Sequence, residues 1–406
     1  MRFSTRVVAT ALVCLGAAAP TLHAQDETDP YTTTRFHVGP LGVTPSIALS
    51  NLGTDDNVFN EATDAKKDTT AAIGPAADVV LRAGRSRLSG KASGQYLYFQ
   101  KYDSQRSWTT TLDGTWRFPM LRITPFVLGN RTNSKDRPGY EIDSRARRID
   151  KTTGVGTDVR LSSKTKLVLT GKRSWSKYDD TEEYLGINLG ERLDRRSDSE
   201  ELQARFRLTP LTTFVVRAQA VQDRFDTATV RNTDSYSVMP GFELRPQALI
   251  SGEAFVGIRR FATLSDVVPD FTGVVASAKV NYALAATRIG MNVSRDITYS
   301  FEALQPYYAL TDVGGDVTQR ITHAWDVVVR ASRQNMAYKN VVNTADPLTE
   351  RTDHSWMGGG GIGYRVGETL RLGFDANYYR RTVDLNDTRN YEGLRLGASI
   401  SYGLPQ

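Results

Sequence analysis

Cysteine, histidine and long apolar runs are scarce in this sequence. Its 406 residues include one cysteine, Cys14, and four histidines. A lone thiol can form neither an intramolecular disulfide nor a multi-thiolate metal site. The histidines show no H-E-x-x-H spacing, and no G-x-S-x-G occurs. We therefore expect no metal or cofactor, no catalytic residues and no enzyme activity.

The longest uncharged apolar run is too short to cross a bilayer as a helix. It extends over residues 7–19, after Arg2 and Arg6, and Pro20 ends it. A basic start, a short apolar stretch and Leu22-His23-Ala24 before Gln25 are typical of a cleaved signal peptide. The segments that we predict are a signal peptide at 1–24, a short periplasmic N-terminal segment at 25–41 and an outer-membrane barrel at 42–406.

An excess of one charge sign is also missing. Lys and Arg number 51 and Asp and Glu 45, and loss of Arg2 and Arg6 with the signal peptide would leave 49 against 45, a net +4. This balance is too mild to indicate a nucleic-acid partner. Because no later run could form a transmembrane helix, a membrane-embedded form would have to be a closed β-barrel.

From residue 42 onward, the chain alternates apolar and polar residues in segments of roughly ten to fifteen. In 370–378 the even positions are Leu, Leu, Phe, Ala and Tyr, whereas the odd ones include Arg371 and Asp375. Residues two apart on a strand share a face, so each segment has one apolar and one polar face. A soluble sandwich has the same alternation, but its strands average about five to six residues. Segment length and the signal peptide together favour a membrane barrel.

The fold class that we predict is all-β, a single transmembrane antiparallel up-and-down barrel of about eighteen strands. The expected strands start near residues 42, 69, 87, 107, 121, 147, 165, 198, 212, 231, 249, 271, 288, 306, 323, 354, 369 and 391. Short turns, several of them containing proline, alternate with longer polar loops such as 51–68, 133–146 and 179–197. This is the asymmetry of short periplasmic turns and longer outer loops. A folded-in loop such as 179–197 could narrow the pore.

Charged residues on the polar face are the main functional prediction, because rings of charge tune ion selectivity in pores. The alternative is that they pair across strands and only keep the interior wet. The proposed pore-lining residues are Lys91, Asp113, Asp158, Arg205, Arg207, Arg217, Glu253, Arg259, Asp326, Arg365, Arg371, Asp375 and Arg395. Their mild basicity predicts that anions pass more readily than cations.

Three local features need separate interpretation. Prolines 45, 75, 125 and 240 fall inside expected strands, where either bulges accommodate them or some strands are broken or shifted. Gly358, Gly360 and Gly363 match G-x-G-x-x-G, but the run continues as a strand with no following helix, so we expect no nucleotide site. Asp55-Asp56 and Asp179-Asp180, with Glu182 and Glu183, could bind divalent cations or bridge to lipopolysaccharide. Because no spacing matches a calcium loop, we interpret them as solvated loop carboxylates.

The opening of the barrel resembles a known family. Arg35-Phe36-His37-Val38-Gly39-Pro40-Leu41, followed by Thr44 to Ser50 and by Asp55-Asp56-Asn57-Val58-Phe59, is similar to the start of a family of outer-membrane β-barrel porins. Members of that family often accompany exopolysaccharide synthesis and export genes. The resemblance implies a barrel of this size and a role in polysaccharide passage, and it supplies no catalytic residues.

Two functions remain open from the sequence. The first is an outer-membrane channel that passes small hydrophilic solutes or an exported polysaccharide. The alternative is a closed structural or surface-binding barrel that acts through its extracellular loops. The expected partners are outer-membrane lipid and lipopolysaccharide, the barrel-assembly machinery and, for polymer export, periplasmic polysaccharide-export components.

Overall fold

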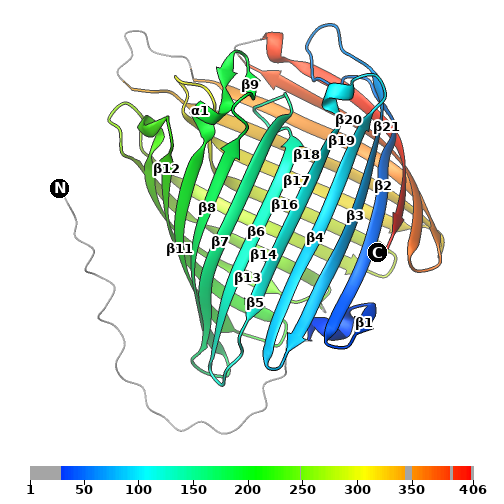
Figure 1. The fold of residues 1–406 in the computed structure, drawn as a ribbon, viewed down its shortest axis with the longest axis vertical. Coiled ribbons are helices and arrows are strands. Elements are labelled where there is room, and N and C mark those ends of the chain that lie inside the picture. The colour runs from blue at the N-terminus through cyan, green and yellow to red at the C-terminus, as the bar shows by residue number, and fades with distance from the viewer. Residues whose placement is uncertain (1–28, 247, 343–349, 385–386, 404–406) are drawn as a thin grey trace.

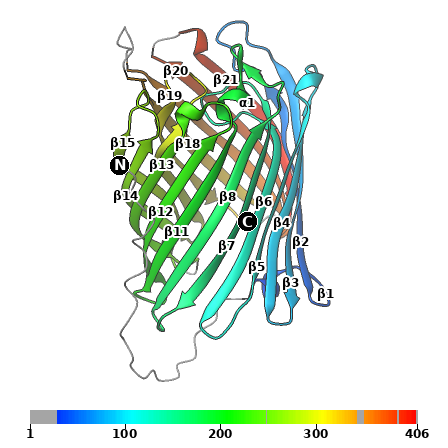
Figure 2. The ribbon, with the colours of Figure 1, turned by 60° about the vertical axis from the view of Figure 1, so that its left-hand side comes forward.

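The computed structural model describes residues 29–246, 248–342, 350–384 and 387–403. Its main sheet closes on itself, because the last strand, β21, pairs with β2 as well as with β20. Each barrel strand is antiparallel to its neighbours, and Figures 1 and 2 show the resulting tilted wall from two sides. The predicted closed barrel of eighteen antiparallel strands is confirmed.

The barrel strands are β2 (Leu41–Asp55), β3 (Asp68–Ala83), β4 (Ser86–Phe99), β5 (Ser107–Arg117), β6 (Ile123–Asp136), β7 (Ala146–Arg160), β8 (Thr165–Tyr178), β11 (Arg195–Arg207), β12 (Thr212–Phe225), β13 (Thr233–Leu244), β14 (Ile250–Thr263), β15 (Phe271–Leu284), β16 (Thr287–Tyr299), β17 (Tyr307–Arg320), β18 (Trp325–Lys339), β19 (Thr352–Val366), β20 (Leu370–Val383) and β21 (Tyr391–Tyr402). The short elements are η1 (Pro30–Thr33), β1 (Phe36–Val38), η2 (Asp103–Gln105), β9 (Glu183–Tyr184), β10 (Ile187–Asn188), α1 (Leu189–Leu193), η3 (Thr229–Arg231) and η4 (Asp387–Arg389).

The observed strand starts agree closely with those expected from alternation. The largest difference is at β11, which begins at Arg195 instead of 198. Its first residues, Arg195 to Asp198, are polar on both faces and therefore lack the alternation that marks a strand. They still pair with β8 and β12 because the wall continues past the apolar band.

Large apolar side chains cover the outside of the barrel. On β20, Leu372 and Phe374 are exposed, and on β18 Val329 is 59% exposed. Such exposure would be costly in water, whereas lipid is as apolar as these side chains. The cross-strand partners of the apolar residues are themselves apolar or small, as in the pair Phe374 and Ala398. The sheet therefore has one apolar face over most of its circumference.

The two ends of the barrel differ in the length of their connections. At one end the strands are joined by tight turns, such as residues 84–85 and 285–286. At the other end lie longer segments, among them 56–67, 137–145 and 179–194, and these carry α1 and the β9–β10 hairpin (Figure 1). β1 and the end of β21 lie at the turn end. Short turns and long loops thus occupy opposite ends, as expected.

Proline affects the ladder without breaking strands. Pro75 remains paired with Ile47 on β2, but β3 and β4 lose their pairing between Ile73 and Ala76. Pairing between β13 and β14 likewise skips Met239 and Pro240. The register is unchanged across both gaps. At these two sites proline interrupts the pairing between strands, but neither a bulge nor a break in the strand forms.

The N-terminal part lies only partly within the described residues. The predicted signal peptide at 1–24 falls outside them, as do residues 25–28. In the rest of the predicted N-terminal segment, β1 folds back on β2, pairing Phe36 with Val43. Among the described residues, no helix is long and apolar enough to cross a membrane.

Candidate pore and its loop-filled mouth

The inner face of the barrel is polar, and the strand register defines it. Residues directly paired across strands share a face. If one residue of a cross-strand row faces inward, all residues of that row therefore face inward. Lys91 is paired with Asp113, and Asp113 with Asn130. The same counting places the whole predicted set on this face: Lys91, Asp113, Asp158, Arg205, Arg207, Arg217, Glu253, Arg259, Asp326, Arg365, Arg371, Asp375 and Arg395.

Ion pairs that skip a strand run along one side of the inner face. Asp326 on β18 is fully buried and accepts hydrogen bonds from Arg365 at 2.9 Å and from Arg371 at 2.6 Å. Arg371 lies on β20, so its side chain must cross β19 to reach β18. It crosses at Gly363, where any Cβ would overlap its guanidinium. The glycine repeat in β19 therefore makes room for ion pairs.

A cavity of about 300 Å³ opens beside these pairs, between β2 and the strands β18, β20 and β21. Three guanidinium groups line it, those of Arg330, Arg371 and Arg395, and Asp375 and Asn377 lie between them. Arg330 pairs with Asp375 at 2.6 Å. The oxygen of the Asn377 side chain is buried without a hydrogen-bond partner among the described residues. The lining is thus polar and richer in cations than in carboxylates.

Arg395 shows that one interpretation from the sequence is wrong. We expected Asp55 to be a solvated loop carboxylate, but it ends β2 and is only 4% exposed. It accepts a hydrogen bond from Arg395 at 2.6 Å and another from the Tyr379 hydroxyl at 2.8 Å. β2 continues farther than expected, and this places the carboxylate inside the barrel.

The opposite part of the wall carries a second chain of ion pairs. Arg205 pairs with Glu243, and Arg217 pairs with Glu253 at 2.9 Å while lying 3.6 Å from Glu243. Their side chains are all partly exposed. These contacts connect four successive strands, β11 to β14. Solvated pairs of this kind contribute little stability.

Five predicted residues complete the set. Asp158 binds Arg117 at 3.0 Å and Lys166 at 2.7 Å. Arg259 binds Asp296 at 3.1 Å. Lys91 is directly opposite Asp113, and neither forms an ion pair with another described residue at bonding distance. Arg207 ends β11 at the turn end and also has no ion pair among the described residues.

The long loops do not simply project outward. Residues 137–145, between β6 and β7, cross the mouth to the far wall. There the Tyr140 hydroxyl donates to Asp312 on β17 at 2.9 Å, and Asp143 binds Arg381 on β20 at 2.7 Å. Glu141 accepts a hydrogen bond from the Ser300 hydroxyl at 2.6 Å. This loop therefore joins parts of the barrel that are many strands apart.

A small apolar core holds the loops together. It contains Ile142 from the crossing loop, Leu189 and Leu193 from α1, and Phe301 from the loop between β16 and β17. Leu189 is completely buried and Phe301 is 1% exposed. The alternation of the wall is absent here, because the residues pack like a soluble core. We name this apolar core and its surrounding polar network the mouth cluster.

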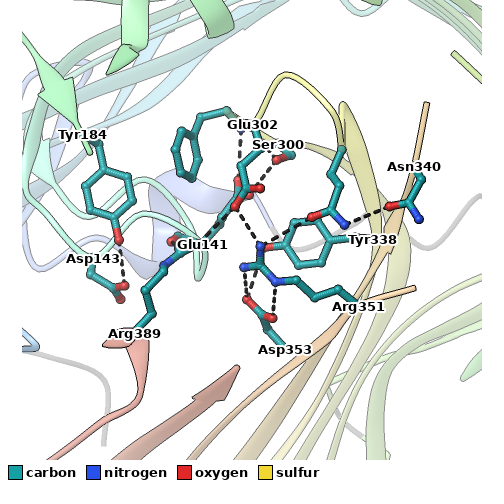
Figure 3. A network of polar contacts seen from close by, with 12 residues as sticks. Glu141, Asp143, Tyr184, Ser300, Glu302, Tyr338, Asn340, Arg351, Asp353 and Arg389 are labelled. Carbon is teal, nitrogen blue, oxygen red and sulfur yellow. Dashed lines mark hydrogen bonds and ion pairs between the residues drawn. The ribbon is translucent and has the colours of Figure 1, made fainter. Parts of the chain in front are cut away.

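Arginines bind carboxylates next to this core, and Figure 3 shows Arg351 and Arg389 in this polar network. Arg351 binds Asp353 at 2.6 Å and Glu302 at 2.8 Å, and Arg389 binds Glu302 at 3.1 Å. Arg381 reaches the same Asp353 at 2.9 Å, and neither side chain is exposed. Two strands and three loops are therefore tied through shared carboxylates.

Two buried ionisable groups lie in the loops of this cluster. Burial raises the pKa of Glu141 to about 7, although hydrogen bonds from Ser300 and Phe301 oppose the rise. Burial also lowers the pKa of Arg231 to about 10, which still leaves it charged at neutral pH. Arg231 donates to the backbone oxygens of Ser300 and Glu302. It thereby holds the loop that faces Glu141.

The mouth cluster was missed from the sequence. Its residues lie in loops or at strand ends, where no periodicity assigns a face. The only signal was loop length, which left open that 179–197 folds inward. In the structure, α1 of this loop packs into the apolar core. Among the described residues, no group of three or more His, Cys, Asp or Glu side chains could hold a metal ion.

Solved structures with a similar outline are outer-membrane proteins of low sequence identity. They include the outer membrane protein OpdK from Pseudomonas aeruginosa (8% identity, TM-score 0.46, covering 89% of this chain and 98% of that one). A BenF-like porin from Pseudomonas fluorescens Pf-5 has 10% identity, TM-score 0.46 and the same coverage. No curated protein matches the chain.

The family comparison covers nearly the whole barrel. Residues 29–402 match the family described as "Putative beta-barrel porin 2". The match begins at the N-terminal segment and ends with the last residue of β21. The chain therefore belongs to this family of porin-type barrels of the bacterial outer membrane.

Proposed function

We propose that this protein is a loop-gated channel for small hydrophilic solutes and that it favours anions over cations. The observation that carries the proposal is the cavity on the inner wall, where three arginines accompany one aspartate. A polar inner face surrounds a lumen that eighteen strands make wide enough for an aqueous path. The mouth cluster supplies the gate.

The charge of the inner wall supports anion preference. Arg330, Arg371 and Arg395 present planar guanidinium groups, which bind carboxylate and phosphate oxygens in pairs. Asp326 is shared by two arginines, so that group keeps one unit of positive charge. Fixed positive charge along a pore attracts anions and lowers the local concentration of cations. Because the remaining pairs are nearly balanced, the preference should be moderate.

Small solutes fit the geometry better than an exported polysaccharide. Loop 137–145 crosses the mouth and is bound to β17 and β20 on the far side. A polymer chain would require this connection to break and remain open during transit. A small solute needs only brief opening around the loop. Polysaccharide export therefore requires a partner that displaces the mouth cluster.

The test is electrical recording of the refolded protein in a planar bilayer under a salt gradient. We expect a reversal potential of the sign for anion selectivity. Arg330→Gln should reduce the preference and Asp375→Asn should increase it, because the two changes alter the same pair in opposite directions. Arg333→Gln is the matched control, since Arg333 lies on the outer face of the same strand. Cation selectivity in the unaltered protein would contradict the proposal.

The alternative is a closed barrel that acts through its loops. It predicts that inserted protein stays silent even after the mouth cluster is weakened by substitution. Conductance that appears only in such weakened variants would instead support a gated channel. Insertion is verified separately by protease protection, so that silence is not confused with a failure to insert.

A further inference from the structure

One sector of the outer surface departs from the apolar pattern of the rest. Near the loop end, the outward-facing residues of β6, β7, β8, β11 and β12 form one cross-strand row: Arg131, Lys151, Trp175, Arg196 and Arg224. Four of its five members are basic. Figure 2 shows β7, β8, β11 and β12 side by side in the near wall. We name this row, with Arg173 in the adjacent row, the outer basic patch.

The patch places like charges directly opposite each other. Arg131 is paired with Lys151, and Arg196 with Arg224. Such pairs are destabilising unless an anion lies between them. Asp198 partly compensates Arg173 at 2.5 Å and Arg196 at 3.3 Å, and Asp234 binds Arg224 at 2.7 Å. No hydrogen bond or ion pair links the side chain of Arg131 or Lys151 to another described residue.

An apolar groove lies next to the patch on the same strands. It has a volume of about 760 Å³ and its walls include Val155, Leu169, Leu202 and Tyr236. Glu200, directly opposite Gly171, is the acidic residue of its outward-facing lining. The floor of the groove includes Gly171, where an added Cβ would meet no atom within 4 Å. Gly171 is two residues along β8 from Arg173, or roughly 7 Å. Cationic groups and an apolar groove are thus adjacent, with the cations nearer the loop end.

We propose that this sector binds a lipid A-type molecule of the outer leaflet, with its phosphates on the outer basic patch and an acyl chain in the groove. Guanidinium and ammonium groups form strong charge-assisted hydrogen bonds with phosphate. Trp175 lies between Lys151 and Arg196, at the level where aromatic side chains meet lipid headgroups. The groove favours a ligand that carries an apolar chain, because a ligand that is only anionic would leave it unfilled. The inference rests on the outer-membrane location and does not depend on conduction.

The opposite wall provides a matched control. There Arg333, Trp356 and Arg380 form a similar cation-tryptophan-cation row. Arg380, however, is directly opposite Glu392, so this row includes a carboxylate, which the five-residue row of the outer basic patch lacks. We therefore expect phosphate to bind more weakly at this row than at the outer basic patch.

The experiment measures lipid binding to the folded full-length barrel in detergent by native mass spectrometry. We expect diphosphorylated lipid A to bind more tightly than monophosphorylated lipid A, and zwitterionic phosphatidylethanolamine to bind weakest. Arg131→Gln with Lys151→Gln should weaken binding of the diphosphorylated lipid by about tenfold or more. Arg380→Gln should change it by less than about twofold. Arg131→Lys should retain binding, which separates charge from folding.

The groove is tested by filling it. Gly171→Leu should weaken binding of the acylated lipid, whereas a deacylated, phosphorylated headgroup should bind as it does to the unaltered protein. The heat-modified mobility of the barrel on gels checks that every variant is folded. The proposal is overturned if the double glutamine variant binds as tightly as the unaltered protein. Equal affinity for phosphatidylethanolamine would overturn it as well.

Discussion

The inner wall and the mouth cluster use the same side chains in opposite ways. On the wall, Arg217 and Glu253 are partly exposed and lie on the inner face. In the mouth cluster, Arg381 and Asp353 are fully buried. When a solvated ion pair separates, water replaces each partner and the free-energy cost is small. When a buried pair separates, a charge is left without a partner and the cost is large. The wall therefore suits ion selectivity, and the mouth suits a two-state closure.

The difference also explains how each region is held together. Hydrogen bonds between neighbouring strands fix the wall, and its ion pairs are additions to a complete ladder. The loops of the mouth have few such ladders, and the small core around Leu189 and Phe301 holds them instead. We expect the mouth to open while the wall remains intact, because local unfolding begins where the fewest contacts must be broken.

Removing one carboxylate from the mouth should have the largest effect. Asp353→Asn leaves Arg351 and Arg381 without their shared anion, at a cost of about 3–5 kcal/mol for a broken buried pair. We expect longer open times in bilayer recordings and faster hydrogen exchange in loop 137–145. Exchange within the barrel strands should be unchanged. Closed behaviour identical to that of the unaltered protein would show that the mouth cluster is not the gate.

The same comparison shows what the sequence could reveal. Alternation assigns a face to each residue of a strand, so the whole wall, including Arg371 and Asp326, was placed from periodicity alone. It could not reveal that these two residues bind each other, because the contact skips β19. The glycines of β19 held that information, since a stripe such as Gly359, Gly361 and Gly363 on one face leaves space for longer neighbours.

The mouth cluster lay beyond such reasoning. Arg389 and Glu302 are far apart in the chain, and both lie in loops. Their contact depends on how several loops fold together across the barrel. The loops lack the alternation that assigns faces, so a single sequence does not determine this arrangement. The interpretation of Asp55 was wrong for a related reason, because Asp55 lies at the boundary between a strand and a loop, where the two sequence patterns merge.

A pH change should have an intermediate effect through Glu141. Its pKa is raised by burial from about 4.5 to about 7 in the closed mouth. The closed state therefore binds a proton more tightly than the open state, in which Glu141 meets water. Closure is strongest below pH 4.5 and weakens as the pH rises to about 7, with little further change above it.

Bilayer recordings between pH 4.5 and 8 measure this dependence. We expect the open probability to increase with pH, and Glu141→Gln to stay mostly closed at every pH because the amide imitates the neutral acid. Ser300→Ala removes a hydrogen-bond donor to Glu141 and should shift the midpoint upward. If Glu141→Gln retained the full pH dependence, another group would be responsible.

The smallest effect is expected on the wall. Arg217→Gln removes a partly exposed pair with Glu253 and should change the free energy of unfolding by less than about 1 kcal/mol. The guanidinium also lies 3.6 Å from the centre of the Phe255 ring, and the amide retains only part of that packing. Urea-induced unfolding in lipid measures the stability, and the reversal potential should move slightly toward cation preference. A destabilisation as large as that of Asp353→Asn would mean that wall and mouth are energetically alike, and the separation of selectivity from closure would fail.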